Sequence, residues 1–106
     1  MKRIWHNKLV RNKIPQIIVK NGATASTKVL SKQEYRQALL EKLVEEAKEL
    51  SSDPGYEERA DVAEVLLAID NEFGFLASEI EEVRAGKAVK RGGFDKRIFL
   101  KYTDED

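Results

Sequence analysis

The stretch KLVEEAKELSSDPGYEERADV, residues 42–62, places acidic side chains on both sides of a short turn. Apolar residues before SSDPG keep helical spacing, and the serine, proline and glycine of that run then break the helix. Asp53 is a candidate N-cap for the helix that follows, and Pro54 suits its first turn. The stretch therefore predicts a helical hairpin.

Residues on the N-terminal side of the hairpin predict a short helix and a loop. The short helix begins near Pro15 and stops at Asn21-Gly22, where the chain enters a small, polar and β-branched loop. Ser31 then stands three residues before Glu34, which is the spacing of a capping box. The first long helix is expected to begin there and to run to about residue 50.

Residues 55–73 predict a second long helix that is apolar on more than one side. Val62, Val65 and Ile69 lie on its main stripe, whereas Ala63 and Leu67 lie away from it. A third amphipathic helix follows Gly74 and ends by Gly92-Gly93, and residues 94–103 read as an extended tail or an edge strand. We expect an all-α antiparallel helical bundle with a short extended C-terminal tail, and oligomerisation to cover its second apolar face.

The bulk composition favours a single cytoplasmic domain spanning residues 1–106. The 106 residues contain 42% hydrophobic side chains and no cysteine. This content suits one buried core and excludes disulfides and thiolate metal sites. Basic and acidic residues balance at 19 each, which gives no global reason to expect a nucleic-acid polymer as partner. No apolar run approaches the roughly 20 residues of a membrane span, so no membrane partner is expected.

Four carboxylates are predicted to converge near the turn. Glu46 and Glu49 come just before it, and Glu58 and Asp61 come just after it with the same spacing. In an antiparallel hairpin with helix axes about 8–10 Å apart, the two pairs lie at similar height. The alternative is that these are ordinary solvated helix faces, which is the usual behaviour of charge runs.

Glu46 and Glu49 break a local preference, because the last turns of a helix disfavour negative charge. Lys42 shares their side of the helix and compensates only in part. A divalent cation would supply the remaining compensation. Oxygen ligands without histidine or cysteine favour Mg²⁺, with Mn²⁺ as the second choice, and such ions commonly share their coordination with substrate phosphates.

The motifs EEAKE and ERAD resemble the EExxE and ExxD pair of the all-α nucleoside triphosphate pyrophosphohydrolases, the superfamily of MazG and phosphoribosyl-ATP pyrophosphohydrolase. NKLVRNKIP and KAVKRGGF resemble the flanking motifs of its short house-cleaning members, so the likeness covers nearly the whole chain. It implies a homodimer or homotetramer with Mg²⁺ held by Glu46, Glu49, Glu58 and Asp61. The sequence departs from the family in a short spacing between the two motifs and in Asn12, where the family usually has aspartate.

Basic side chains at two places are candidates for contact with substrate phosphates. One group precedes the short helix and the other lies near the end of the last helix: Lys8, Arg11 and Lys13, then Lys87 and Arg91. The two arginines are favoured because guanidinium binds phosphate in a bidentate way. Glu45, which neighbours the metal pair, is the candidate to orient or deprotonate the attacking water.

These features predict a Mg²⁺-dependent enzyme that cleaves a standard or non-standard nucleoside triphosphate to monophosphate and pyrophosphate. Hydrolysis of phosphoribosyl-ATP in histidine synthesis is the alternative within enzymes. Outside enzymes, the alternative is a helical oligomerisation or binding module whose acids are only solvated. The residues do not specify the base or sugar of a nucleotide substrate.

Overall fold

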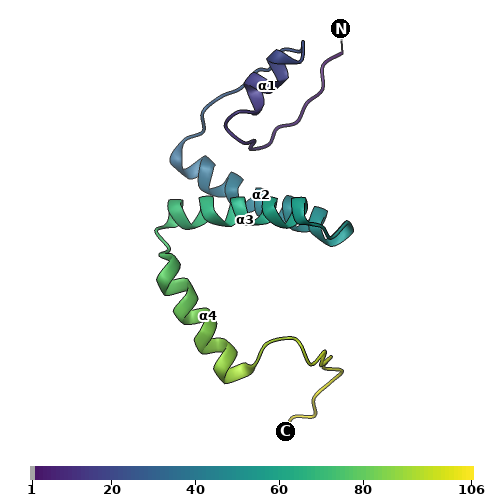
Figure 1. Cartoon of the computed structure of the whole chain (residues 1–106), viewed down its shortest axis with the longest axis vertical. Helices are drawn as coiled ribbons and strands as arrows, with labels where there is room; N and C mark the ends of the chain where they lie inside the picture. Colours follow the sequence, from purple (N-terminus) through teal and green to yellow (C-terminus); the bar gives the residue numbers. More distant parts are fainter. Residues whose placement is uncertain (1) are drawn as a thin grey trace. The chain divides into compact units, whose positions relative to one another are not determined.

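The computed structural model describes residues 2–106, and these residues form helices with no strand. The helices are α1 (Ile14–Lys20), α2 (Lys32–Ser52), α3 (Tyr56–Phe73) and α4 (Ala77–Arg91), as Figure 1 shows. This confirms the all-α class. The described residues after α4 contain a turn near Asp95 and otherwise irregular backbone, so the edge strand considered for residues 94–103 is wrong.

The chain divides into two compact units, Met1–Gly74 and Phe75–Asp106. The first unit contains α1, α2 and α3, and the second contains α4 and the C-terminal segment. Gly74 closes α3 in the left-handed conformation, with φ 73°, which glycine adopts without steric cost. The single domain expected over residues 1–106 stays a prediction.

The N-terminus of α2 is fixed by the predicted capping box. The Ser31 hydroxyl accepts a hydrogen bond from the backbone N–H of Glu34 at 3.2 Å. In return, the backbone N–H of Ser31 donates to Glu34 Oε1 at 3.0 Å. Two N–H groups that have no partner within the helix are thereby satisfied.

The turn between α2 and α3 differs in detail from the expectation. The backbone N–H of Asp53 donates to the carbonyl of Glu49, so Asp53 ends α2 and does not cap α3. Gly55, in extended conformation, is the N-cap residue of α3, and no side chain caps that end. Pro54 therefore lies in the turn and not in the first turn of α3.

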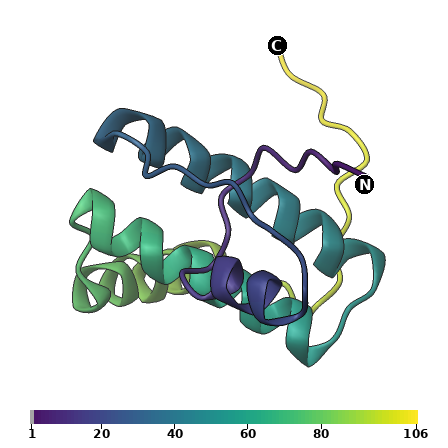
Figure 2. The same cartoon turned by 90° about the horizontal axis from the view of Figure 1, so that it is seen from above.

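Apolar packing between α2 and α3 forms the core of the first unit. The two helices run antiparallel side by side (Figures 1 and 2), as the hairpin prediction required. The buried apolar residues are Leu39 of α2 and Val65 and Ile69 of α3. Partly buried hydrophobic residues pack around them, and they come from both helices and from the segment before α1: Leu9, Tyr35, Leu43, Ala68 and Phe73.

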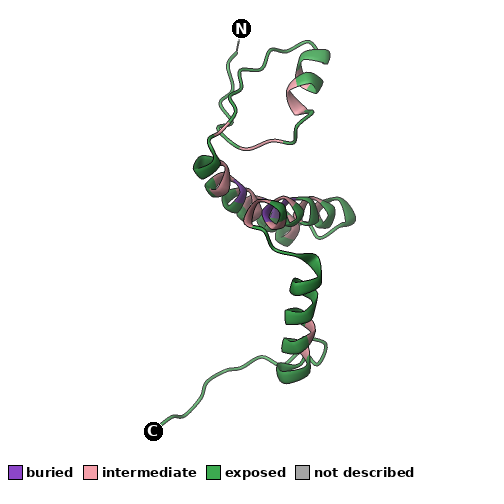
Figure 3. Ribbon diagram, turned by 90° about the vertical axis from the view of Figure 1, so that its left-hand side faces the viewer, coloured by how far each residue is buried: buried purple, intermediate pink, exposed green. Residues whose placement is uncertain are grey.

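Other apolar residues of the same two helices remain exposed. Leu40 and Val44 of α2 and Leu66 and Leu67 of α3 belong to this group. Figure 3 shows the buried positions concentrated on α2 and α3, and no residue of α4 is buried. The complete bundle and its oligomerisation stay predictions.

Among residues 2–106, no helix combines the length and apolar character needed to cross a membrane.

We predict that Ser31→Ala lowers the free energy of unfolding by about 1 kcal/mol, because it removes the side chain that caps α2. Ser26→Ala is the matched control, since Ser26 is exposed in the loop before α2 and its hydroxyl has no hydrogen-bond partner in the described part of the chain. Urea unfolding followed by circular dichroism measures both variants. Equal midpoints for the two variants would contradict the prediction.

Candidate metal centre

Three of the predicted metal ligands lie together across the α2–α3 packing. Glu46 and Glu49 are nearly one turn apart on α2, and Asp61 faces them from α3. Each offers a carboxylate oxygen, and these oxygens all lie within 4.8 Å of one another. We call this group the acidic triad. The acidic triad forms because hydrophobic contacts between α2 and α3 hold the EEAKE and ERAD motifs at the same height along the hairpin.

Glu46 is the buried member of the acidic triad. Its residue surface is only 7% exposed, and it is the one charged residue among the buried residues described. Oε1 lies 3.2 Å from Lys42 Nζ, whereas the buried Oε2 has no hydrogen-bond partner. A buried acceptor without a donor is costly, and such a group in a native protein needs an explanation. A cation bound by the acidic triad would provide one.

The charge of the acidic triad also affects Glu49. Its pKa is raised above the ordinary value of 4.5, first because the neutral form of Glu49 can donate a hydrogen bond to the Glu46 carboxylate and then by the negative charge of Glu46. Burial and the charge of Glu45 act in the same direction. The neutral form of Glu49 is therefore favoured more in the folded protein than in the unfolded chain.

Glu45 lies beside the acidic triad without joining it. Lys8 Nζ donates to Glu45 Oε1 at 2.9 Å, and Lys42 Nζ donates to Oε2 at 3.2 Å. The hydrogen bond from Lys8 is the largest cause of a lowered Glu45 pKa, and Lys42 adds to it against the opposing effect of burial. With both oxygens engaged by lysines, Glu45 is better placed to orient a water molecule than to take its proton.

The segment before α1 brings two cations to the acidic surface. Lys8 pairs with Glu45, and Arg11 Nη2 lies 2.7 Å from Asp61 Oδ1. Leu9, which stands between the two in the sequence, packs against the core and anchors this segment. The sequence predicted both cations as phosphate contacts but did not predict their carboxylate partners, because the loop that returns the segment to α2 carries no signal of its direction.

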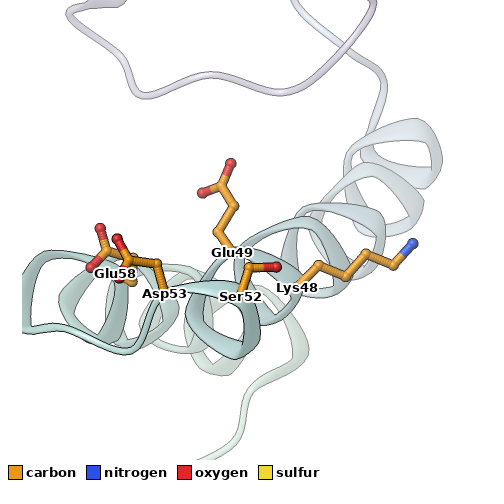
Figure 4. Close-up of a pocket in the computed structure, with 5 residues that line it drawn as sticks. All are labelled: Lys48, Glu49, Ser52, Asp53 and Glu58. Carbon is orange, nitrogen blue, oxygen red and sulfur yellow. The ribbon is translucent and has the colours of Figure 1, made fainter.

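Glu58 is separate from the acidic triad. It occupies the first turn of α3 and is half-buried, and a β-carbon built on Gly55 would lie 2.6 Å from its Oε1. Figure 4 shows Glu58 and Asp53 at the turn, with Glu49 pointing away from both. These side chains, with Lys48 and Ser52, line an open hollow at the end of the hairpin. Three of the four predicted ligands are thus brought together.

The remaining predicted phosphate contacts are exposed side chains. Lys13 is exposed at the N-cap position of α1, and within residues 2–106 no ion pair involves it. Lys87 and Arg91 are exposed on α4 in the second unit. Their contacts with a substrate stay predictions.

The acidic triad fits a hard divalent cation. Mg²⁺ binds oxygens at about 2.0–2.1 Å, so two oxygens on opposite sides of it lie about 4.2 Å apart. A group within 4.8 Å reaches that spacing through small side-chain adjustments. The three residues of the triad offer only carboxylate oxygens, which are the ligands that hard divalent cations prefer.

Comparisons of the chain with models of known families, with curated proteins and with solved structures find no match. The resemblance to the MazG superfamily therefore depends on the sequence motifs.

We predict that millimolar Mg²⁺ or Mn²⁺ raises the melting temperature, because the ion binds carboxylates that are close together only in the folded protein. Glu49→Gln should raise the melting temperature of the metal-free protein and reduce the shift caused by metal. The sign follows from the raised pKa of Glu49, since a neutral side chain at this position is favoured in the folded state.

Glu64→Gln is the matched control, because Glu64 is exposed in the middle of α3 and its side chain has no ion pair or hydrogen bond among residues 2–106. It should keep the full metal-induced shift. Thermal unfolding with metal and with a chelator measures the three proteins. A Glu49→Gln protein that responds to metal as strongly as the wild type would exclude Glu49 as a ligand.

Proposed function

We propose that the protein is a Mg²⁺-dependent nucleotide pyrophosphohydrolase that hydrolyses a nucleoside triphosphate to monophosphate and pyrophosphate. The observation that carries the proposal is the buried Glu46, whose Oε2 has no hydrogen-bond partner beside two further carboxylates. A solvated helix face does not bury one of its acids. The EExxE and ExxD motifs support the same reaction, because they contain these carboxylates.

In this proposal, the carboxylates of the acidic triad bind the cation, and the exposed side of the triad faces the substrate. Glu46, Glu49 and Asp61 would hold the cation, which supplies charge neutralisation on the phosphates when bound. The exposed side of the triad, where Glu49 lies, would face the substrate, and the buried Glu46 would stay fixed by Lys42. A triphosphate carries several negative charges, which explains why a substrate of this class would need the cation.

Cations near the triad would bind and orient the substrate. Arg11 and Lys8 are the best supported, because both already lie at the acidic surface. Lys13, Lys87 and Arg91 are proposed as phosphate contacts from the sequence motifs alone. Glu45 would orient the water that attacks the phosphoanhydride, after Lys8 has turned from Glu45 to the substrate.

We also propose that the working form is a homodimer or homotetramer. Leu40, Val44, Leu66 and Leu67 support this, since the residues of the first unit leave these apolar side chains exposed. A second copy of the chain would cover such a surface.

The test is a panel of nucleoside triphosphates and phosphoribosyl-ATP, assayed for pyrophosphate release with Mg²⁺. We predict release from at least one nucleotide, and at least a hundredfold loss in Asp61→Asn, because the amide cannot replace a charged metal ligand. Glu64→Gln should keep wild-type activity. Full activity in Asp61→Asn would remove the acidic triad from the proposed mechanism, and inactivity of the wild type on the whole panel would contradict the function.

A further inference from the structure

Arg11 holds a carboxylate that the proposed cation would also need. Its Nη2 lies 2.7 Å from Asp61 Oδ1, and Asp61 is a member of the acidic triad. In the described structure the guanidinium therefore supplies positive charge where the metal would supply it. The guanidinium and the cation would therefore compete for the negative charge of Asp61.

The pair formed by Arg11 and Asp61 is suited to exchange. Both side chains are open to solvent, with 56% of the Arg11 side chain and 40% of the Asp61 side chain exposed. Exposed ion pairs of this kind contribute about 0–1 kcal/mol to stability. A divalent cation that binds three carboxylates would therefore displace Arg11 from Asp61 at small cost. The buried pair of Lys42 with Glu46 differs, because the Lys42 side chain is only 15% exposed.

The backbone near Arg11 is held in place while its side chain is open to solvent. Leu9 packs against the core of the first unit, and the carbonyl of Arg11 accepts a hydrogen bond from the N–H of Ile14 at the start of α1. A displaced Arg11 therefore remains beside the acidic triad. A guanidinium at that position is a ready donor for a phosphate bound to the same cation.

We propose that Arg11 exchanges partners during binding: it pairs with Asp61 in the metal-free protein and moves to a substrate phosphate when the cation takes Asp61. The phosphate half of this proposal rests on the proposed function, whereas the competition for Asp61 does not. The exchange links the two binding events, because the cation releases the residue that then binds phosphate. Arg11 thus weakens metal binding and strengthens phosphate binding.

Calorimetric titration with Mn²⁺ tests the competition, using Arg11→Gln and the matched variant Lys8→Gln. Lys8 lies in the same segment and forms an ion pair of similar length, but its partner Glu45 lies outside the acidic triad. We expect Arg11→Gln to bind Mn²⁺ about two- to fivefold more tightly than the wild type, and Lys8→Gln to gain clearly less, because the partner of Lys8 is not a member of the acidic triad. Inorganic pyrophosphate added to the Mn²⁺-saturated proteins should bind at least about tenfold more weakly to Arg11→Gln than to the wild type.

If Arg11 had only a structural role, the substitution would give a different pattern. It would lower the melting temperature and weaken the binding of both Mn²⁺ and pyrophosphate. Unchanged or weaker Mn²⁺ binding in Arg11→Gln would overturn the exchange while leaving the metal site intact. Equal tightening in Lys8→Gln would also overturn it, since the effect would then come from net charge alone. A wild-type protein that binds no Mn²⁺ would overturn both the exchange and the proposed function.

Discussion

The packing of α2 on α3 holds together carboxylates that would otherwise separate. Burying a large aliphatic side chain contributes about 1.5–3 kcal/mol, and Leu39, Val65 and Ile69 provide this contribution at the helix contact. The same contact places Asp61 against Glu46 and Glu49. The acidic triad is therefore a consequence of apolar burial elsewhere on the same two helices, and every functional inference depends on that arrangement.

The protein compensates the negative charge of the acidic surface with its own cations. Lys42 contacts the inner part of the acidic surface from α2, and Lys8 and Arg11 reach it from the segment before α1. Compensation is incomplete at Glu46 Oε2, which remains buried without a donor, and at Glu49, whose pKa is raised. Glu46 and Glu49, whose charge is not fully compensated, are the residues at which a divalent cation would bind. Lys8 and Arg11 lie beside them, where they could contact phosphates bound to that cation. This arrangement connects the stability of the hairpin to its proposed chemistry.

Local sequence signals predicted the helices well, because caps and breakers act over a few residues. Ser31 with Glu34 marked the start of α2, and Gly74 marked the end of α3. The turn was predicted less well: Asp53 suits either the end of one helix or the start of the next, and its backbone bond to Glu49 decides for the first. Helical spacing also predicted that Glu46, Glu49 and Asp61 lie together, as the structure shows. It did not predict that Glu58 lies against Gly55. Long-range pairs such as Arg11 with Asp61 depend on how a loop returns, which composition does not encode.

Crystallographic anomalous scattering at the manganese absorption edge tests the central claim most directly, because it locates a bound ion without any assumption about activity. Crystals grown with millimolar Mn²⁺ should show an anomalous peak within about 2.5 Å of carboxylate oxygens of Glu46, Glu49 and Asp61. Glu46 Oε2, which has no hydrogen-bond partner among the described residues, should be among those oxygens. A well-diffracting crystal with no peak at the acidic triad, or with Mn²⁺ only at other carboxylates, would contradict the metal centre.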